Sequence, residues 1–221
     1  MWFLLLERKG SEVRQEQSNL PYPATICAQG RKDRMQIIDT RLRDVKRIRP
    51  KIHGDERGWF SEIFKANEFA AAGLPTRFVQ DNQSFSQRGV LRGLHYQIVA
   101  PQGKLVRAIA GHIWDVAVDL RPGSHQFGQW AGFDLRGEEL ELIWIPEGFA
   151  HGFIVLSETA SVFYKTTDYY FPEGERCIRW NDPELAITWP LDGIGQPAVS
   201  ARDATAPALD EAELPPTHPG V

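Results

Sequence analysis

The chain has 221 residues and a mass of 25.0 kDa, enough for one domain with a sizeable apolar core. Its net charge of −4 at pH 7 argues against general attraction to nucleic acid or an anionic membrane, so a phosphate group would have to be held by local arginines. The apolar run 2–6 is too short for a signal peptide or a membrane span. The distant Cys27 and Cys177 indicate neither a disulfide framework nor a zinc motif, and we expect a cytoplasmic protein.

Residues 1–34 mix charged residues, Gln and Ser with prolines and show neither helical nor strand periodicity. This composition predicts a disordered N-terminal extension. We expect one folded domain over residues 35–210, beginning with a strand over 36–40, and a C-terminal tail over residues 211–221.

The next two extended runs predict a hairpin. The segment 54–58, which separates residues 45–53 from residues 59–64, contains Gly and Asp and makes a hairpin the simplest interpretation. One helix is expected over 66–73, with Asn67 as its N-cap and Gly73 as its C-terminal stop.

Short predicted strands then follow one another at intervals of roughly ten residues, which is typical of a sandwich or barrel rather than a doubly wound sheet. These strands are expected over residues 104–110, 112–120, 128–135, 140–145, 149–156, 161–168 and 176–180.

Alternation within the predicted strand 112–120 separates two faces. Trp114, Val116 and Val118 fall on an apolar face, which we expect to pack on a second sheet. Asp115 and Asp119 fall on the other face. We favour a polar cavity for Asp115, the alternative being a solvated outer face.

The segment 80–97 concentrates amides, arginines, glycines and a histidine, a composition that indicates a site rather than a plain core strand. The spacing from Gly89 to His95, and the later segment 146–151 that ends in His151, resemble the two motifs of the cupin β-barrels. Metal-binding cupins carry two histidines one residue apart and a nearby glutamate, whereas Tyr96 and Gln97 follow His95 here. An amide is a poor ligand for first-row metals, so we expect no metal and assign His95 to proton chemistry.

Eight segments together resemble the dTDP-4-dehydrorhamnose 3,5-epimerases, and the resemblance runs from about residue 35 to about residue 210. They are DERGWFSE at 55–62, QDN at 80–82, GVLRGLHYQ at 89–97, QGKLVR at 102–107, DVAVDLR at 115–121, FGQW at 127–130, IPEGFAHGF at 145–153 and WNDP at 180–183. The resemblance implies an all-β, cupin-type double-sheet antiparallel barrel with short peripheral helices. It also implies a homodimer, a dTDP-linked 4-keto-6-deoxy sugar as substrate, no cofactor, and neither a nucleic-acid nor a membrane partner.

These enzymes epimerise carbons 3 and 5 next to a keto group, which requires a base, a cation beside the enolate oxygen and an acid on the opposite ring face. His95 matches the family base. Asp203 matches its carboxylate partner, although it could instead be a helix N-cap. Lys104 matches the cation near the keto oxygen, the alternative being a solvent-facing edge-strand lysine. Tyr164 matches the acid, and Tyr170 is its rival.

The resemblance also carries over a set of substrate-binding residues, in which arginines suit a diphosphate. The set comprises Arg57, Glu62, Gln80, Asp81, Asn82, Arg92, Lys104, His151, Glu175 and Arg202. Arg202 departs from the lysine usual in the family, so its contact geometry is expected to differ. Strict alternation would place Arg92 and His95 on opposite faces, so we expect either a bulge at Gly93 or a contact of Arg92 across a strand edge or subunit boundary.

Three other functions remain open at this point. A sister enzyme that epimerises carbon 3 or carbon 5 alone would use the same residues. A sugar-nucleotide binding module without turnover would not need His95, Lys104, Tyr164 and Asp203 together. A metal-dependent cupin oxygenase would hold stoichiometric iron or manganese.

Overall fold

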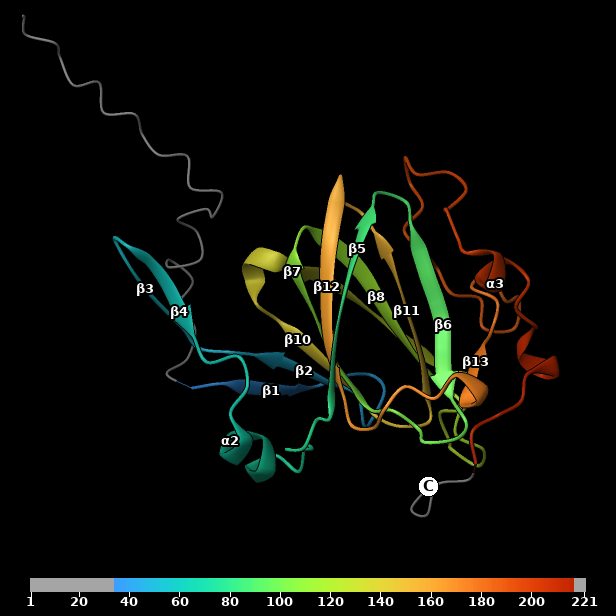
Figure 1. Cartoon of the computed structure of the whole chain (residues 1–221), viewed down its shortest axis with the longest axis horizontal. Coiled ribbons are helices and arrows are strands. Elements are labelled where there is room, and N and C mark those ends of the chain that lie inside the picture. The colour runs from blue at the N-terminus through green and yellow to red at the C-terminus, as the bar shows by residue number, and fades with distance from the viewer. Residues whose placement is uncertain (1–33, 217–221) are drawn as a thin grey trace, which may run out of the picture.

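The computed structural model describes residues 34–216, so the predicted disordered extension lies outside the described residues except for its last position. Two antiparallel sheets face each other as a barrel (Figure 1). The first sheet has the order β1 (Gln36–Asp39), β2 (Lys46–Arg49), β10 (Leu142–Ile145), β7 (Lys104–Ala110), β12 (Thr159–Thr166) and β5 (Gln80–Gln87). The second has the order β13 (Glu175–Cys177), β6 (Leu91–Gln97), β11 (Phe149–Val155), β8 (His112–Asp119) and β9 (Trp130–Arg136). The predicted all-β, cupin-type double-sheet barrel is confirmed.

Helices are short and peripheral in this part of the chain, as expected. They are α2 (Ala66–Ala71) and α3 (Ala201–Ala204), with the 3₁₀ helices η1 (Gly137–Glu139), η2 (Pro172–Gly174) and η3 (Leu209–Glu211). Within residues 34–216 no helix is long and apolar enough to cross a membrane. Contacts with the barrel continue past residue 210, because the Tyr96 hydroxyl donates a hydrogen bond to the carbonyl oxygen of Glu213 over 2.8 Å.

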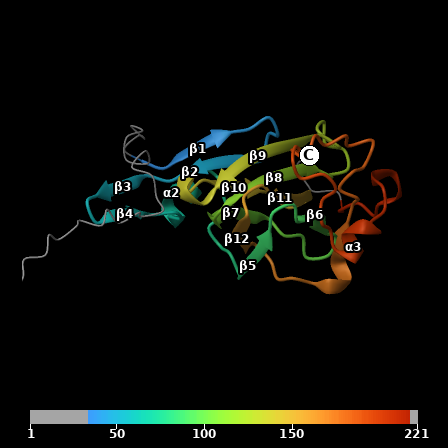
Figure 2. The same ribbon diagram turned by 90° about the horizontal axis from the view of Figure 1, so that it is seen from above.

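A separate two-stranded sheet, β3 (Ile52–Asp55) and β4 (Gly58–Ser61), forms the predicted hairpin and projects away from the barrel (Figure 2). The expectation of one continuous strand before it is wrong. Proline has no N–H to continue a ladder, and Pro50 separates β2, in the first sheet, from β3, in the hairpin. The turn is also shorter than expected and consists of Glu56 and Arg57.

The start of α2 differs from the prediction. Lys65, in an extended conformation, is the N-cap, and Asn67 lies inside the first turn. Phe64 and Phe69 pack edge to face with ring centroids 4.8 Å apart, the hydrophobic staple that fixes how the chain enters a helix. This packing explains why the helix begins before Asn67 can cap it. Gly73, with φ of +69°, ends the helix region as predicted.

One face of β8 packs as predicted and the other does not. Ile113 and Ala117 join the core between the two sheets, and Asp115, which shares their face, is fully buried. The preference for an interior Asp115 is therefore confirmed. The apolar face with Val116 and Val118 does not pack on a second sheet, because it is covered by C-terminal residues such as Trp189. The second sheet is thus buried on both faces, which alternation within one strand could not reveal.

Candidate active site

A bulge in β6 decides which side chains share the barrel interior. His95 lies opposite His151 of β11, whereas Arg92 lies opposite Phe153, so three steps along β6 match two along β11. The extra residue puts Arg92 and His95 on the same face. A side chain at Gly93, where φ is +128°, would come within 2.6 Å of the Gly152 backbone, so glycine is required. Of the two alternatives for Arg92, the bulge is correct.

His95 and Asp203 form a close pair. The Nε2 atom of His95 lies 2.7 Å from Oδ1 of Asp203, and the Gly93 N–H lies 3.4 Å from Oδ2. Burial would raise the pKa of Asp203, but the hydrogen bond and charge of His95 outweigh burial and lower it. Asp203 is not the cap of α3, because Ser200 is that N-cap and its hydroxyl accepts the Asp203 N–H. With Nε2 donating to the carboxylate, Nδ1 is the basic nitrogen of His95.

Cys177 is a member of this cluster that the sequence reasoning missed. It pairs with His95 across β13 and β6, and its Sγ lies 3.7 Å from Oδ1 of Asp203. Burial, followed by the charge of Asp203, raises the pKa of the thiol to about 12. No local spacing in the sequence signals this contact, because β13 and β6 are far apart in the chain and meet only in the folded structure. The one available signal is that Cys177 lies two residues after Glu175 and therefore on the same face of a strand.

Lys104 is buried at the start of β7, a central strand between β10 and β12, so the edge-strand alternative is wrong. Its Nζ donates a hydrogen bond to the carbonyl oxygen of His95 over 3.2 Å. Burial lowers the pKa of Lys104 to about 8, against the opposing charges of Glu175 and Asp115. The ammonium thus reaches from the first sheet to the strand that carries His95.

A second histidine–carboxylate pair lies in the barrel interior. The Nε2 atom of His151 is 2.7 Å from Oδ2 of Asp115, and both side chains are buried. The other oxygen, Oδ1 of Asp115, has no hydrogen-bond partner within the described residues.

Tyr164 lies on β12 of the first sheet, whereas His95 lies on β6 of the second. Tyr164 packs against the core between the sheets and has its pKa raised by burial and then by the charge of Glu175, while Arg92 lowers it. Arg92 itself donates from Nε to the Ser86 hydroxyl of β5 over 3.1 Å. Base and acid candidates therefore come from opposite walls of the barrel.

Glu175, on the edge strand β13, links Tyr170, the alternative acid candidate, to Arg202 of α3. The Tyr170 hydroxyl donates to Oε2 of Glu175 over 2.7 Å, and the same oxygen accepts from Nη1 of Arg202. Tyr170 is half exposed. Gln80 joins this group, because its Oε1 accepts the Tyr170 N–H over 3.0 Å.

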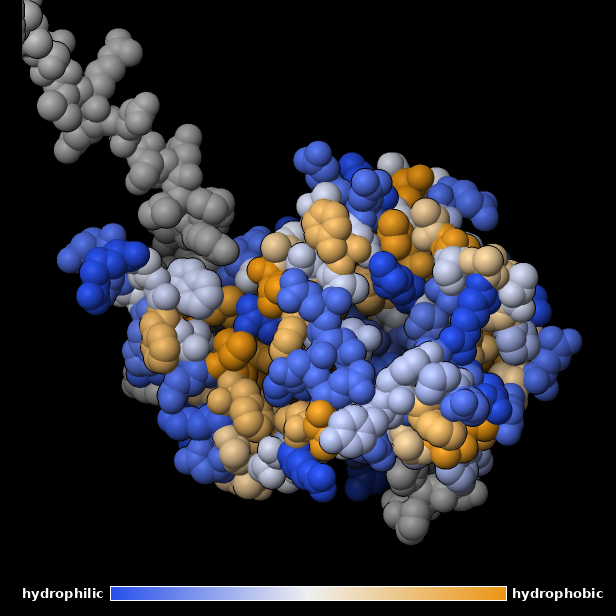
Figure 3. All heavy atoms as spheres, viewed as in Figure 1, coloured by the Kyte–Doolittle hydropathy of each residue, from blue (hydrophilic) through white to orange (hydrophobic). Residues whose placement is uncertain are grey.

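Three predicted binding residues open β5, and they do not share one face. Gln80 and Asn82 are joined by a 2.9 Å hydrogen bond, and Asn82 lies opposite Tyr164. Asp81 points to the other face, where its carboxylate pairs with Lys165 over 2.6 Å. Hydrophilic side chains gather over β5 and β12 in the middle of this face of the molecule (Figure 3).

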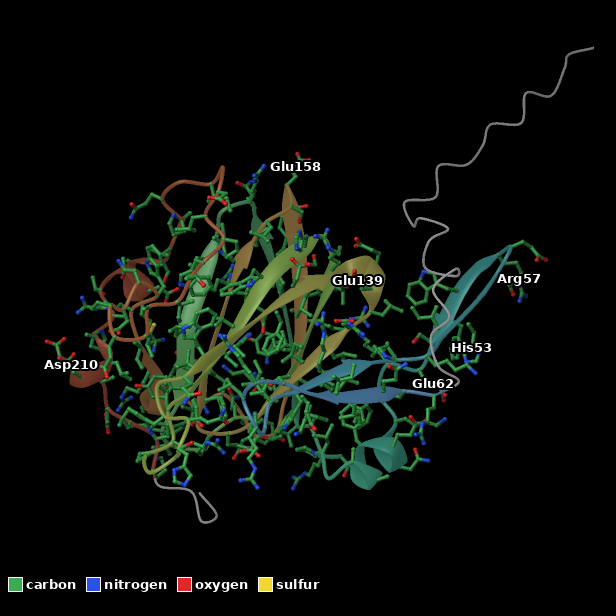
Figure 4. All side chains as sticks on the ribbon, turned by 180° about the vertical axis from the view of Figure 1, so that it is seen from behind. His53, Arg57, Glu62, Glu139, Glu158 and Asp210 are labelled. Atoms are coloured by element: carbon green, nitrogen blue, oxygen red, sulfur yellow. The ribbon has the colours of Figure 1, made fainter. Side chains whose placement is uncertain are left out.

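Two predicted binding residues lie far from the cluster within one chain. Arg57 is at the tip of the β3–β4 hairpin, largely exposed and paired with Asp55, and Glu62 follows β4 and pairs with Lys65 (Figure 4). The structure of one chain therefore does not bring them to His95.

The arrangement can perform proton transfer at a carbon acid. It offers a base with a carboxylate partner, a buried cation, and a phenol on the facing wall, which are the three groups that stepwise enolisation requires.

A model of the dTDP-4-dehydrorhamnose 3,5-epimerase family matches residues 39–211. The dTDP-4-dehydrorhamnose 3,5-epimerase of Pseudomonas aeruginosa is 55% identical over 180 residues, which span 81% of this chain and 98% of that protein. The crystal structure of a dTDP-6-deoxy-D-glucose-3,5-epimerase from Legionella pneumophila, in complex with dTDP-4-keto-L-rhamnose, is similar with a TM-score of 0.80 at 52% identity. That match covers 84% of this chain and 100% of the other. ChmJ, a 3'-monoepimerase from Streptomyces bikiniensis in complex with dTDP-quinovose, is similar with a TM-score of 0.75 at 34% identity, covering 80% of this chain and 92% of that one.

Proposed function

The chain belongs to the dTDP-4-dehydrorhamnose 3,5-epimerase family, and from this premise we infer that it is an isomerase of dTDP-L-rhamnose biosynthesis. It inverts carbons 3 and 5 of dTDP-4-dehydro-6-deoxy-D-glucose to give dTDP-4-dehydro-L-rhamnose. The observation that carries this function is the pairing of His95 with Asp203 on one wall of the barrel, with Lys104 and Tyr164 supplied by the other.

The chemistry follows from the positions of these groups. Nδ1 of His95 removes the proton next to the keto group, and Asp203 stabilises the imidazolium that forms. The Lys104 ammonium stabilises the negative charge on the enolate oxygen. Tyr164 returns a proton from the opposite ring face, which inverts the carbon. A sugar between the two sheets meets base and acid on opposite faces.

The diphosphate needs cationic partners, because the chain as a whole is acidic. Arg92 and Arg202 are candidates, and a guanidinium donates two hydrogen bonds at once to a phosphate. Arg202 already pairs with Glu175, so its guanidinium is held near the mouth of the site before substrate arrives. Gln80, Asn82 and His151 complete the proposed polar contacts with the substrate.

A homodimer would complete the site. Arg57 and Glu62 match family binding residues, yet they lie on a hairpin that extends away from the barrel of their own chain. In a symmetric dimer the hairpin of each subunit can reach the site of the other. We propose this arrangement, with one catalytic domain over residues 35–210 in each subunit and a cytoplasmic location suited to the free thiol of Cys177.

The second candidate is a mono-epimerase, favoured by the likeness to ChmJ. The test is to incubate the protein with dTDP-4-dehydro-6-deoxy-D-glucose and to determine the configuration of the product at both carbons from its proton coupling constants. Inversion at both carbons supports the proposed function. A product inverted at one carbon alone would make the chain a mono-epimerase, and no conversion at all would leave a binding module.

A further inference from the structure

The cluster of His95, Cys177 and Asp203 has the ligand types and spacing of a transition-metal site. One ring nitrogen of His95, Sγ of Cys177 and a carboxylate oxygen of Asp203 all lie within 4.8 Å of one another. With bonds of roughly 2.0 to 2.3 Å, tetrahedral zinc holds its ligand atoms about 3.3 to 3.6 Å apart. The 3.7 Å between Sγ and Oδ1 matches this spacing, and the 2.7 Å between Nε2 and Oδ1 needs to open by roughly half an ångström.

The elements that carry these residues hold them in place and leave one side open. Cys177 is paired directly with His95 through the β13–β6 ladder, and Asp203 is fixed on α3. Cys177 and Asp203 are buried, whereas the His95 side chain is 32% exposed. A cation can therefore enter beside the imidazole, and water can fill the fourth position of a tetrahedral site.

We propose that His95, Cys177 and Asp203 bind a thiophilic divalent cation such as Zn²⁺, and that the bound cation inhibits the enzyme. The thiol of Cys177 loses its proton to solvent on binding, so the thiolate and the Asp203 carboxylate together balance the two positive charges of the ion. The site is inhibitory and distinct from a catalytic metal centre, because the cation occupies the atoms that serve the base.

Inhibition follows from the tautomer of His95, and this step rests on the proposed role of His95 as the base. Without metal, Nε2 carries the proton and donates it to Asp203, which leaves Nδ1 basic. A metal ion bound to Nε2 displaces the proton from that nitrogen, and the single ring proton of the neutral imidazole then lies on Nδ1. The nitrogen that would accept the proton of the sugar is then already protonated, and Asp203 no longer stabilises an imidazolium.

The test is a Co²⁺ titration of the chelator-treated full chain, followed by its thiolate-to-metal absorption band, together with Zn²⁺ inhibition of turnover. Cys177→Ser removes the soft ligand at nearly constant size, Cys177→Ala is the second variant, and Cys27→Ser is the matched control with the other cysteine. We expect the band in the wild type and in Cys27→Ser and its loss in both Cys177 variants. The Zn²⁺ concentration for half inhibition should rise by at least about tenfold in Cys177→Ser, and a chelator should restore wild-type activity.

Absence of the band in the wild type, its loss in Cys27→Ser instead, or unchanged Zn²⁺ inhibition of Cys177→Ser would each overturn the proposal. The two readouts also separate this inference from the proposed function. A chain that shows the Cys177-dependent band but does not epimerise the sugar has the metal site and lacks the activity.

Discussion

His95 and His151 lie directly opposite each other on β6 and β11, and a different buried carboxylate holds each ring. Asp203 pairs with His95 from the C-terminal segment, whereas Asp115 pairs with His151 from the neighbouring strand β8. The His95 side chain is partly exposed and the His151 pair is enclosed. The two pairs thus neighbour each other on the same sheet, one partly open to solvent and the other enclosed.

The buried pair predicts a stability difference. Asp115→Ala leaves Nε2 of His151 without its partner in the interior, and the free energy of unfolding should fall by roughly 1 to 3 kcal/mol. Asp134→Ala is the surface control. Asp134 is half exposed and pairs with His112 at 2.8 Å and with Arg136 at 3.1 Å, and the loss of both surface pairs should stay below about 1 kcal/mol. Urea unfolding measures both. Equal losses would show that the interior pair contributes no more than the surface pair.

Lys104 predicts an alkaline limit to activity. Its pKa is lowered to about 8 by burial, so the ammonium that we propose to stabilise the enolate is lost as the pH rises through about 8. We expect kcat/KM to fall above that pH, and Lys104→Gln to lose roughly 10²- to 10³-fold at pH 7 together with the alkaline limb. A wild-type profile that stays flat to pH 9.5 would contradict this role.

The same pKa makes a stability prediction with a defined sign. Between about pH 8 and the ordinary lysine pKa of 10.5, the unfolded chain binds more protons at Lys104 than the folded chain does. Lys104 therefore contributes an increase in stability as the pH rises through this window, and Lys104→Gln should remove that contribution. The difference between the urea unfolding curves of the two proteins at pH 7.5 and 10 measures it.

Tyr164 and Tyr170 can be separated by single-turnover experiments in deuterium oxide. Tyr164→Phe should slow reprotonation by roughly 10²-fold or more while proton abstraction by His95 continues. Tyr170→Phe removes hydrogen bonds to Glu175 and Arg202 and should slow reprotonation less. Normal turnover of Tyr164→Phe would transfer the acid role to Tyr170 or to water.

Subunit mixing tests whether the hairpin completes the partner's site. Arg57→Ala and His95→Ala homodimers should both be impaired. If each site takes Arg57 from the partner subunit, a mixed dimer has one site with both wild-type residues, and equal random mixing should restore about a quarter of wild-type activity. Arg57→Ala mixed with wild-type chains that carry no second change is the control. No gain on mixing would place Arg57 in the site of its own chain or outside any site.

Local patterns in the sequence predicted where strands form better than which segments pack against them. Alternation along β8 separated the face of Asp115 from the apolar face. The spacing of the short strands indicated a sandwich or barrel, and the family resemblance implied the cupin-type barrel. The chain order could not show that residues near Trp189 cover the outer face of β8, because that packing joins segments far apart. The continuous strand expected over 45–53 was wrong because Pro50, which has no N–H for the ladder, breaks it between β2 and β3.

The candidate site shows the same division. The segment 80–97 contains both His95 and Arg92. A bulge at Gly93 was one of the two predicted ways to place these side chains on the same face. Cys177 was missed because only the β13–β6 ladder brings it to His95. Asn67 failed as a cap because α2 begins earlier, with Lys65 as its N-cap, where Phe64 packs against Phe69.

The most direct test follows the protons on carbons 3 and 5 of dTDP-4-dehydro-6-deoxy-D-glucose by NMR in deuterium oxide, with the wild type and with His95→Ala. We predict that the wild type exchanges both protons for deuterium, and that His95→Ala exchanges neither while it still binds the nucleotide. Exchange at one carbon alone would contradict double epimerisation. Full exchange by His95→Ala would contradict the assignment of His95 as the base.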